Sequence, residues 1–102
     1  MLTSKQRAYL RGIANTYETV LIVGKVGITE NLIKQADETF EARELIKGRV
    51  LETSDISAME TADIIAEKTK SDVVQVIGSK FILFRQKKKE SQFVLPKSKK
   101  KS

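Results

Sequence analysis

The residues with the clearest potential for chemistry form a short glycine loop, Gly24-Lys25-Val26-Gly27, followed closely by Thr29. Glycines allow another molecule to approach the backbone closely, and Lys25 places a positive charge between them. Thr29 is a suitable first residue for a helix, whose free N-terminal amides favour an anion. The pattern therefore indicates a site for a phosphate group.

The spacing of the two glycines is by itself a weak signal. The mononucleotide P-loop needs G-x-x-x-x-G-K-S/T and the dinucleotide fingerprint needs G-x-G-x-x-G, and the chain has neither. KH domains grip a sugar-phosphate backbone with a G-x-x-G loop, but that loop joins two helices, whereas this one follows a strand. Local residues alone support a tight turn, with glycines that only satisfy backbone geometry, as well as an anion site.

A second candidate set is basic and lies in the expected first helix: Lys5, Arg7 and Arg11. Arg7 and Arg11 are one helical turn apart and lie off the apolar stripe of the helix. Such a pair usually only improves solubility. It becomes a phosphate clamp if the fold sets it beside another anion site, and we expect that arrangement here.

Weaker candidates lie further along the chain. Lys47 and Arg49 share one face of an expected strand, where they either extend a basic surface or, as we favour, are solvated or paired with Glu44 and Glu52. The aromatic residues occupy inward positions, so we expect no exposed stacking platform of the RRM type. These are Phe40, Phe81 and Phe84.

The composition removes several classes of chemistry. The chain has no cysteine and no histidine, which excludes Ser-His and Cys-His catalysis and the usual zinc ligand sets. No constellation gathers a nucleophile, a base and an orienting group, so a hydrolase or transferase using Asp, Glu and Lys is a minor alternative. We therefore expect no catalytic site, no metal, no cofactor and no small-molecule substrate.

Charge is distributed unevenly along the chain, whose net charge is +6. Residues 85–102 carry eight basic residues against Glu90, which gives +7, and the remaining residues sum to −1. Within that remainder, residues 1–27 carry +3 and residues 28–84 carry −4. Basic ends around an acidic middle suit contact with a polyanion through one face. A solvated surface with a lysine-rich tail explains the same charges.

Hydrophobic periodicity predicts an α/β fold with the element order α-β-α-β-α-β-β, in which helices pack on a four-stranded mixed sheet in two layers. The first strand, residues 19–23, is apolar on both faces, as an interior strand should be. The second should run parallel to it. The last two strands are joined by Gly78-Ser79, a two-residue hairpin signal. The expected helices span residues 4–15, 29–43 and 57–70, and the expected strands span residues 19–23, 44–52, 72–77 and 80–86.

At 102 residues the chain is expected to be one domain, residues 1–96, followed by a disordered lysine-rich tail, residues 97–102. Phe93-Val94-Leu95 can add a short edge strand that Pro96 ends. The N-terminal residues do not resemble a signal peptide, and no apolar run is long enough for a membrane span. We expect a cytoplasmic monomer.

Four runs of residues resemble the YhbY family, which comprises stand-alone bacterial CRM domains. The resemblance covers the chain from Leu2 to about Pro96, in order and at the family's spacing. The runs are LTSKQRAYLRGIA (residues 2–14), VGKVGITE (23–30), ELIK (44–47) and VVQVIG (73–78).

The resemblance implies a fold similar to the C-terminal domain of the third bacterial translation initiation factor. It also implies RNA binding through the G-x-x-G loop and neighbouring basic residues, in precursors of the large ribosomal subunit. The chain departs from the family pattern at Asn15, where a histidine is frequent, and at Thr19, where a proline is frequent. The lysine-rich extension after Pro96 is not a family requirement.

The sequence thus predicts a non-enzymatic protein that binds ribosomal RNA in large-subunit precursors and assists ribosome assembly. Loop residues Gly24 to Gly27 and Thr29 would hold phosphates, with Lys5, Arg7 and Arg11 beside them. The alternative is a permanent ribosomal component or a protein-interaction module, in which the loop has no dedicated role in RNA binding.

Overall fold

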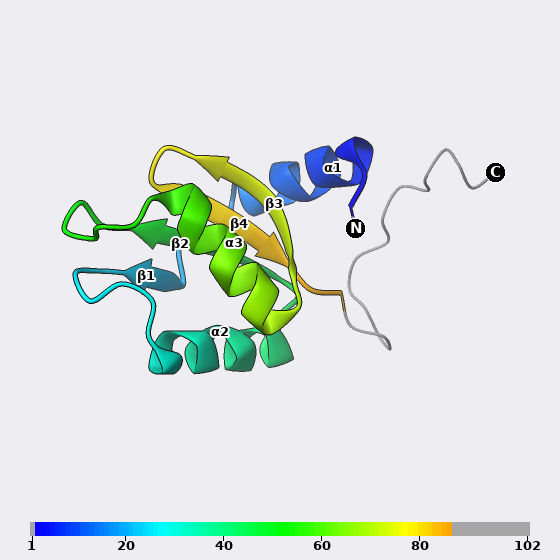
Figure 1. Ribbon diagram of the computed structural model, residues 1–102. Coiled ribbons are helices and arrows are strands. Elements are labelled where there is room, and N and C mark those ends of the chain that lie inside the picture. Colours follow the sequence, from blue (N-terminus) through cyan, green and yellow to red (C-terminus); the bar gives the residue numbers. More distant parts are fainter. Residues whose placement is uncertain (1, 87–102) are drawn as a thin grey trace.

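The computed structural model describes residues 2–86, which form three helices and four strands (Figure 1). The expected tail and the expected edge strand of residues 93–95 lie outside this range. The predicted α/β class and element order are confirmed. The elements are α1 (Ser4–Ala14), β1 (Leu21–Val23), α2 (Glu30–Ala42), β2 (Leu45–Val50), α3 (Ala58–Thr69), β3 (Asp72–Ile77) and β4 (Lys80–Phe84).

Hydroxyl side chains begin all three helices. Thr3 accepts a hydrogen bond from the Gln6 amide while the Gln6 side chain accepts one from the Thr3 amide, which completes a capping box. Thr29 and Ser57 cap α2 and α3 through their hydroxyl groups, which accept hydrogen bonds from the amides of Leu32 and Glu60. These short-range signals are present in the sequence, which is why the helix starts were predictable.

The sheet has the strand order β1-β2-β4-β3. β1 runs parallel to β2, as predicted for a strand-helix-strand unit, and β4 runs antiparallel to both of its neighbours. Gly78, with φ of +59°, forms the tight turn between β3 and β4. The pairing of β3 with β4 shifts between Val73 and Gln75, a bulge on the outer strand.

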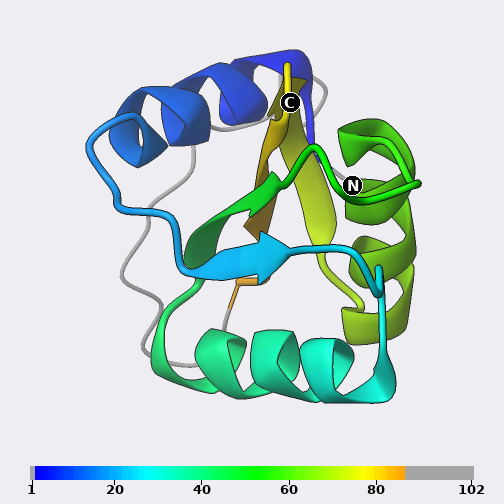
Figure 2. The same cartoon turned by 90° about the vertical axis from the view of Figure 1, so that its left-hand side faces the viewer.

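Helices cover both faces of the sheet, so the expected two-layer packing needs a correction to three layers (Figure 2). α2 and α3 pack on one face. α1 packs on the other face, where Leu10 and Ala14 are buried against Leu45, Ile82 and Phe84. The reason is the alternation of β2 and β4, which carry apolar residues on both faces at this end and so must bury both.

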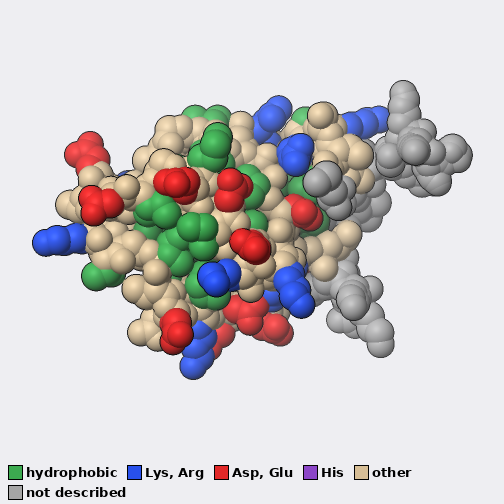
Figure 3. Space-filling view, in the orientation of Figure 1, with side chains coloured by type: hydrophobic (Ala, Val, Ile, Leu, Met, Phe, Trp, Pro, Cys, Tyr) green, Lys and Arg blue, Asp and Glu red, His purple; other side chains and the backbone are tan. Residues whose placement is uncertain are grey.

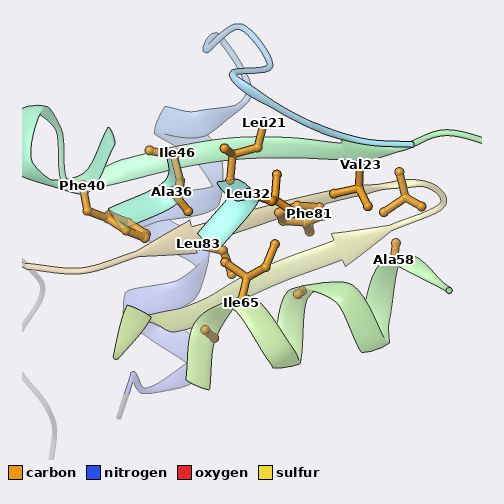
Figure 4. Packing of buried hydrophobic residues seen from close by; sticks show 13 residues of the cluster. Leu21, Val23, Leu32, Ala36, Phe40, Ile46, Ala58, Ile65, Phe81 and Leu83 are labelled. Atoms are coloured by element: carbon orange, nitrogen blue, oxygen red, sulfur yellow. The ribbon is translucent and has the colours of Figure 1, made fainter. Parts of the chain in front are cut away.

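The larger core lies between the sheet and helices α2 and α3 (Figure 4). Phe40, Phe81 and Phe84 are all buried, which confirms that the aromatic rings point inward. Gly48 faces Phe81 across β2 and β4, and a β-carbon on Gly48 would lie 2.2 Å from the Phe81 ring. The glycine therefore makes room for the ring.

The expectation that β1 is an interior strand is wrong. β1 is an outer strand of three residues, and Ile22 exposes 52% of its surface on the face that α1 covers elsewhere. α1 packs mainly on β3 and β2. An apolar strand at the edge of a small sheet can leave one face uncovered because single exposed apolar residues are tolerated.

Arg85 joins three elements at the end of the sheet away from the glycine loop. Its Nη1 atom lies 2.6 Å from Asp37 Oδ1 in α2 and donates to the Thr69 carbonyl at the end of α3, at 2.9 Å. The guanidinium also lies 4.8 Å from the centre of the Phe40 ring. Arg85 was counted with the basic C-terminal segment, but its charge is neutralised within the fold.

Candidate nucleic-acid interface

The glycine loop forms a single tight turn at the carboxyl end of β1. The Gly27 amide donates to the Gly24 carbonyl at 2.9 Å, which places Lys25 and Val26 at the corner of the turn. Lys25 is exposed, and Val26 exposes 82% of its surface. The turn therefore presents one cation and one apolar side chain to solvent, with nothing in residues 2–86 covering them.

The two glycines have different reasons to be glycine. Gly27 has φ of +73°, a left-handed conformation that strains other residues. Gly24 has no such conformation, and a β-carbon there would lie 3.7 Å from Leu51 Cδ1, an ordinary contact. The fold thus requires glycine at position 27 but not at position 24. Close approach by another molecule is a further reason for a glycine at position 24.

Rigid elements hold both ends of the turn. Before it, the Leu51 amide donates to the Val23 carbonyl at 2.8 Å, which extends the β1-β2 ladder to the start of the loop. After it, the Thr29 hydroxyl accepts from the Leu32 amide at 3.1 Å. The first amides of α2 are unpaired within the helix by its geometry and favour an anion. Exposed Glu30 in this first turn opposes that attraction.

Arg7 does not lie beside the loop, in contrast to the expectation. The Arg7 Nε atom donates to the Val73 carbonyl at 3.3 Å, at the bulge of β3. β3 and β1 are the two outer strands, so roughly 14 Å of sheet separates them. Lys5 and Arg11 are exposed on the same helix. The cause is that α1 packs on β3 and β2.

Other cations are closer to the loop. Arg49 is opposite Ile22 of β1 and also opposite Lys80 of β4, and both basic side chains are exposed. Lys47 donates to the Tyr17 carbonyl at 3.3 Å. Arg49 is exposed, in agreement with the expectation that these side chains are solvated or paired, and within residues 2–86 no ion pair joins Lys47 or Arg49 to Glu52.

Sequence reasoning missed Lys80 as a candidate. The available signal was strand alternation, because Lys80 lies two residues before Ile82 and four before Phe84, on the same face. Finding it also required the pairing of β2 with β4, which the order of elements does not reveal. Only the sheet register brings Lys80 to Arg49.

The opposite face of the molecule is mixed in charge. Acidic side chains are scattered among hydrophobic and basic ones over α2 and α3 (Figure 3).

Within the described part of the chain, no three His, Cys, Asp or Glu residues gather as a possible metal site. None of the helices in residues 2–86 has the length and apolar character needed to cross a membrane.

Residues 2–85 match the model of the CRS1/YhbY (CRM) domain family. A Bacillus subtilis protein named Probable RNA-binding protein YqeI is 38% identical over 96 residues, which cover 94% of this chain and the whole of that protein. A Methanocaldococcus jannaschii protein, also named as a probable RNA-binding protein, is 34% identical over 98% of this chain and 75% of its own length.

A solved structure is also similar. It is the solution structure of a hypothetical protein from Staphylococcus aureus, described as a candidate RNA-binding protein, with a TM-score of 0.80 and 45% identity. The match covers 94% of this chain and all of the other. Fold and sequence therefore agree over nearly the whole chain.

Proposed function

We propose that this chain, which belongs to the CRS1/YhbY (CRM) domain family, binds RNA through the turn formed by residues 24–27. The observation that carries the proposal is the exposed Lys25 turn, which rigid elements hold at both ends and in which Gly24 has no structural need to be glycine. The names of the relatives support RNA as the ligand.

In this model the turn holds the sugar-phosphate backbone. A phosphate approaches the main chain at Gly24 and Gly27, Lys25 supplies a positive charge, and the first turn of α2 after Thr29 orients its amides toward the anion. Val26, at the exposed corner, contacts sugar or base. Backbone contacts of this kind position the RNA and read little sequence.

Lys5, Arg7 and Arg11 form a separate contact in the proposal. Their distance from the turn means that they meet a different part of the RNA. Arg7 also has a structural role at Val73, so its substitution would change stability as well as binding. Lys5 and Arg11 are exposed and are the cleaner positions for tests of this contact.

The RNA that we propose is ribosomal RNA in precursors of the large subunit, and the biological role is assistance in ribosome assembly without enzymatic activity. The support is the resemblance to stand-alone bacterial CRM domains over nearly the whole chain. Sedimentation of cell extracts tests this part. An assembly factor would accumulate with large-subunit precursors, whereas a permanent component would follow mature subunits in fixed ratio.

A charge reversal tests the turn. Lys25→Glu should weaken binding to a short fluorescein-labelled single-stranded RNA of mixed sequence. It should also reduce the slope of log affinity against log salt by about one, since one phosphate contact is lost. Arg43→Glu is the matched control, because Arg43 is exposed at the end of α2 farthest from the turn. Equal effects of the two variants would contradict the turn as an RNA contact.

A further inference from the structure

Beyond the turn, a row of four residues crosses all four strands on the face that α1 covers only in part. Ile22 is opposite Arg49, Arg49 is opposite Lys80, and Lys80 is opposite Ile77. The two isoleucines expose 52% and 61% of their surfaces. We call Ile22, Arg49, Lys80 and Ile77 the cross-strand row. Its outer positions are apolar and its centre is basic.

The centre of the cross-strand row is electrostatically unfavourable in the free protein. Like charges directly opposite one another on neighbouring antiparallel strands destabilise a sheet. Neither Arg49 nor Lys80 has an ion-pair partner within residues 2–86, and the row contains no carboxylate. A polyanion bound there would relieve the repulsion that the fold leaves uncompensated.

Beside the row lies a small hollow of about 170 Å³ at the end of α1, lined by Asn15, Lys47, Gln75, Ile77, Lys80 and Ile82. It is well below the roughly 300 Å³ of small-molecule sites, so a cofactor does not fit there. The side-chain amides of Asn15 and Gln75 have no hydrogen-bond partner in the described residues. The two side-chain amides can hydrogen-bond the polar edge of a single base, the two isoleucines offer it apolar contact, and the two lysines can meet an adjoining phosphate.

The row continues directly from the glycine turn. Ile22 lies two residues before Gly24 on β1, so about 7 Å of extended chain separates them. An RNA strand held at the turn can therefore continue over the sheet without leaving the protein surface.

We infer that the open half of the sheet face is a second RNA-contact surface, which takes the strand leaving the turn. Arg49 and Lys80 hold its phosphates, the isoleucines of the row pack against its sugars and bases, and one base enters the hollow. The inference rests on the proposed function, because it requires RNA at the turn. Charge favours RNA over a protein partner, since the row and the hollow together contain three cations and no Asp or Glu.

The test uses the full chain and the same short fluorescein-labelled single-stranded RNA. Arg49→Glu and Lys80→Glu should each weaken affinity several-fold and reduce the salt slope by about one. Arg43→Glu, with the same change in net charge as Arg49→Glu, is the control and should change both quantities less. In amide NMR spectra of the wild-type protein, RNA should shift Ile22, Arg49, Ile77 and Lys80 as well as the turn.

The outcomes separate the two ideas. If Lys25→Glu weakens binding while Arg49→Glu and Lys80→Glu match the Arg43→Glu control, the second surface is overturned and the turn stands. RNA-induced shifts confined to the turn lead to the same conclusion. If the wild-type protein does not bind the RNA, the proposed function fails and the second surface fails with it.

Discussion

Two arginines, Arg85 and Arg49, lie at opposite ends of the same sheet and have opposite surroundings. Arg85 is three-quarters buried and meets Asp37, the carbonyl of Thr69 and the Phe40 ring. Arg49 is exposed, has no carboxylate partner in residues 2–86 and is opposite Lys80. The first charge is used inside the fold, whereas the second remains available for an external anion. Net charge alone cannot separate these two roles.

The largest effect is expected from removing the paired arginine. Arg85→Ala should lower the free energy of unfolding by about 2 kcal/mol, because its charge-assisted hydrogen bonds to α2 and α3 are lost. Urea denaturation measures this. RNA affinity at a temperature where the variant is folded should change little. Arg85→Lys keeps the charge but not the two-point geometry, and should recover only part of the stability.

The assignment of a structural role to Arg85 and a binding role to Arg49 would be wrong if Arg85→Ala changed RNA affinity more than Arg49→Ala did, with both proteins folded. That result would place the paired arginine on the binding surface. It would also show that an internal partner does not mark a structural role in this protein.

A smaller effect separates the two glycines of the turn. Gly27→Ala should cost about 1 kcal/mol of stability, because alanine is strained at a φ of +73°. Gly24→Ala should leave stability within about 0.5 kcal/mol, because its methyl group has room. The same methyl group should weaken RNA binding, since it lies where the phosphate approaches. Thermal unfolding and RNA titration of both variants measure the two quantities.

If Gly24→Ala binds RNA like the wild type, close approach at that glycine is not needed. The turn would then act through Lys25 and its other proposed contacts. A loss of stability in Gly24→Ala would instead show that the residue has a structural role in the free protein.

The smallest effect has the opposite sign. Arg49→Glu should stabilise the fold by roughly 0.5 kcal/mol, because a like-charge pair with Lys80 becomes an opposite-charge pair. Affinity for RNA should fall in the same variant. Chemical denaturation at low salt is the appropriate measurement, since salt screens exposed charges. A variant that is both more stable and weaker in binding would show that the cation is maintained for a partner at a cost in stability.

If Arg49→Glu destabilises the protein, Arg49 has an internal role like that of Arg85. The contrast between the two ends of the sheet would then disappear. Arg43→Glu again serves as the control for the change in net charge.

Much of the fold could be predicted because its signals are short-range. Caps at Thr3, Thr29 and Ser57, the alternation of β2 and the Gly78-Ser79 turn each depend on residues close in sequence. Strand order, by contrast, depends on which pairing buries the most apolar surface. The interior position expected for β1 was therefore wrong, because the same apolar run fits an edge or a centre.

In the candidate site, too, local features could be predicted and long-range ones could not. The turn at Gly24 to Gly27 was predictable because strand, turn and helix cap are contiguous in the chain. Two features could not be predicted from the sequence. One is the distance of Arg7 from the turn, and the other is the pairing of Lys80 opposite Arg49. Both depend on which strands α1 covers and on how β2 and β4 are aligned.

The sequence by itself determined the α/β order, the helix caps and the tight turn at Gly24 to Gly27, because these follow from neighbouring residues and backbone geometry. The tertiary structure alone decided which cations share a surface with that turn. Arg85 is neutralised because α2, α3 and β4 converge on it. Arg49 and Lys80 remain exposed because α1 covers the end of the sheet face at Leu45, Ile82 and Phe84 and leaves the end at Arg49 and Lys80 open. No local sequence pattern specifies where a helix packs.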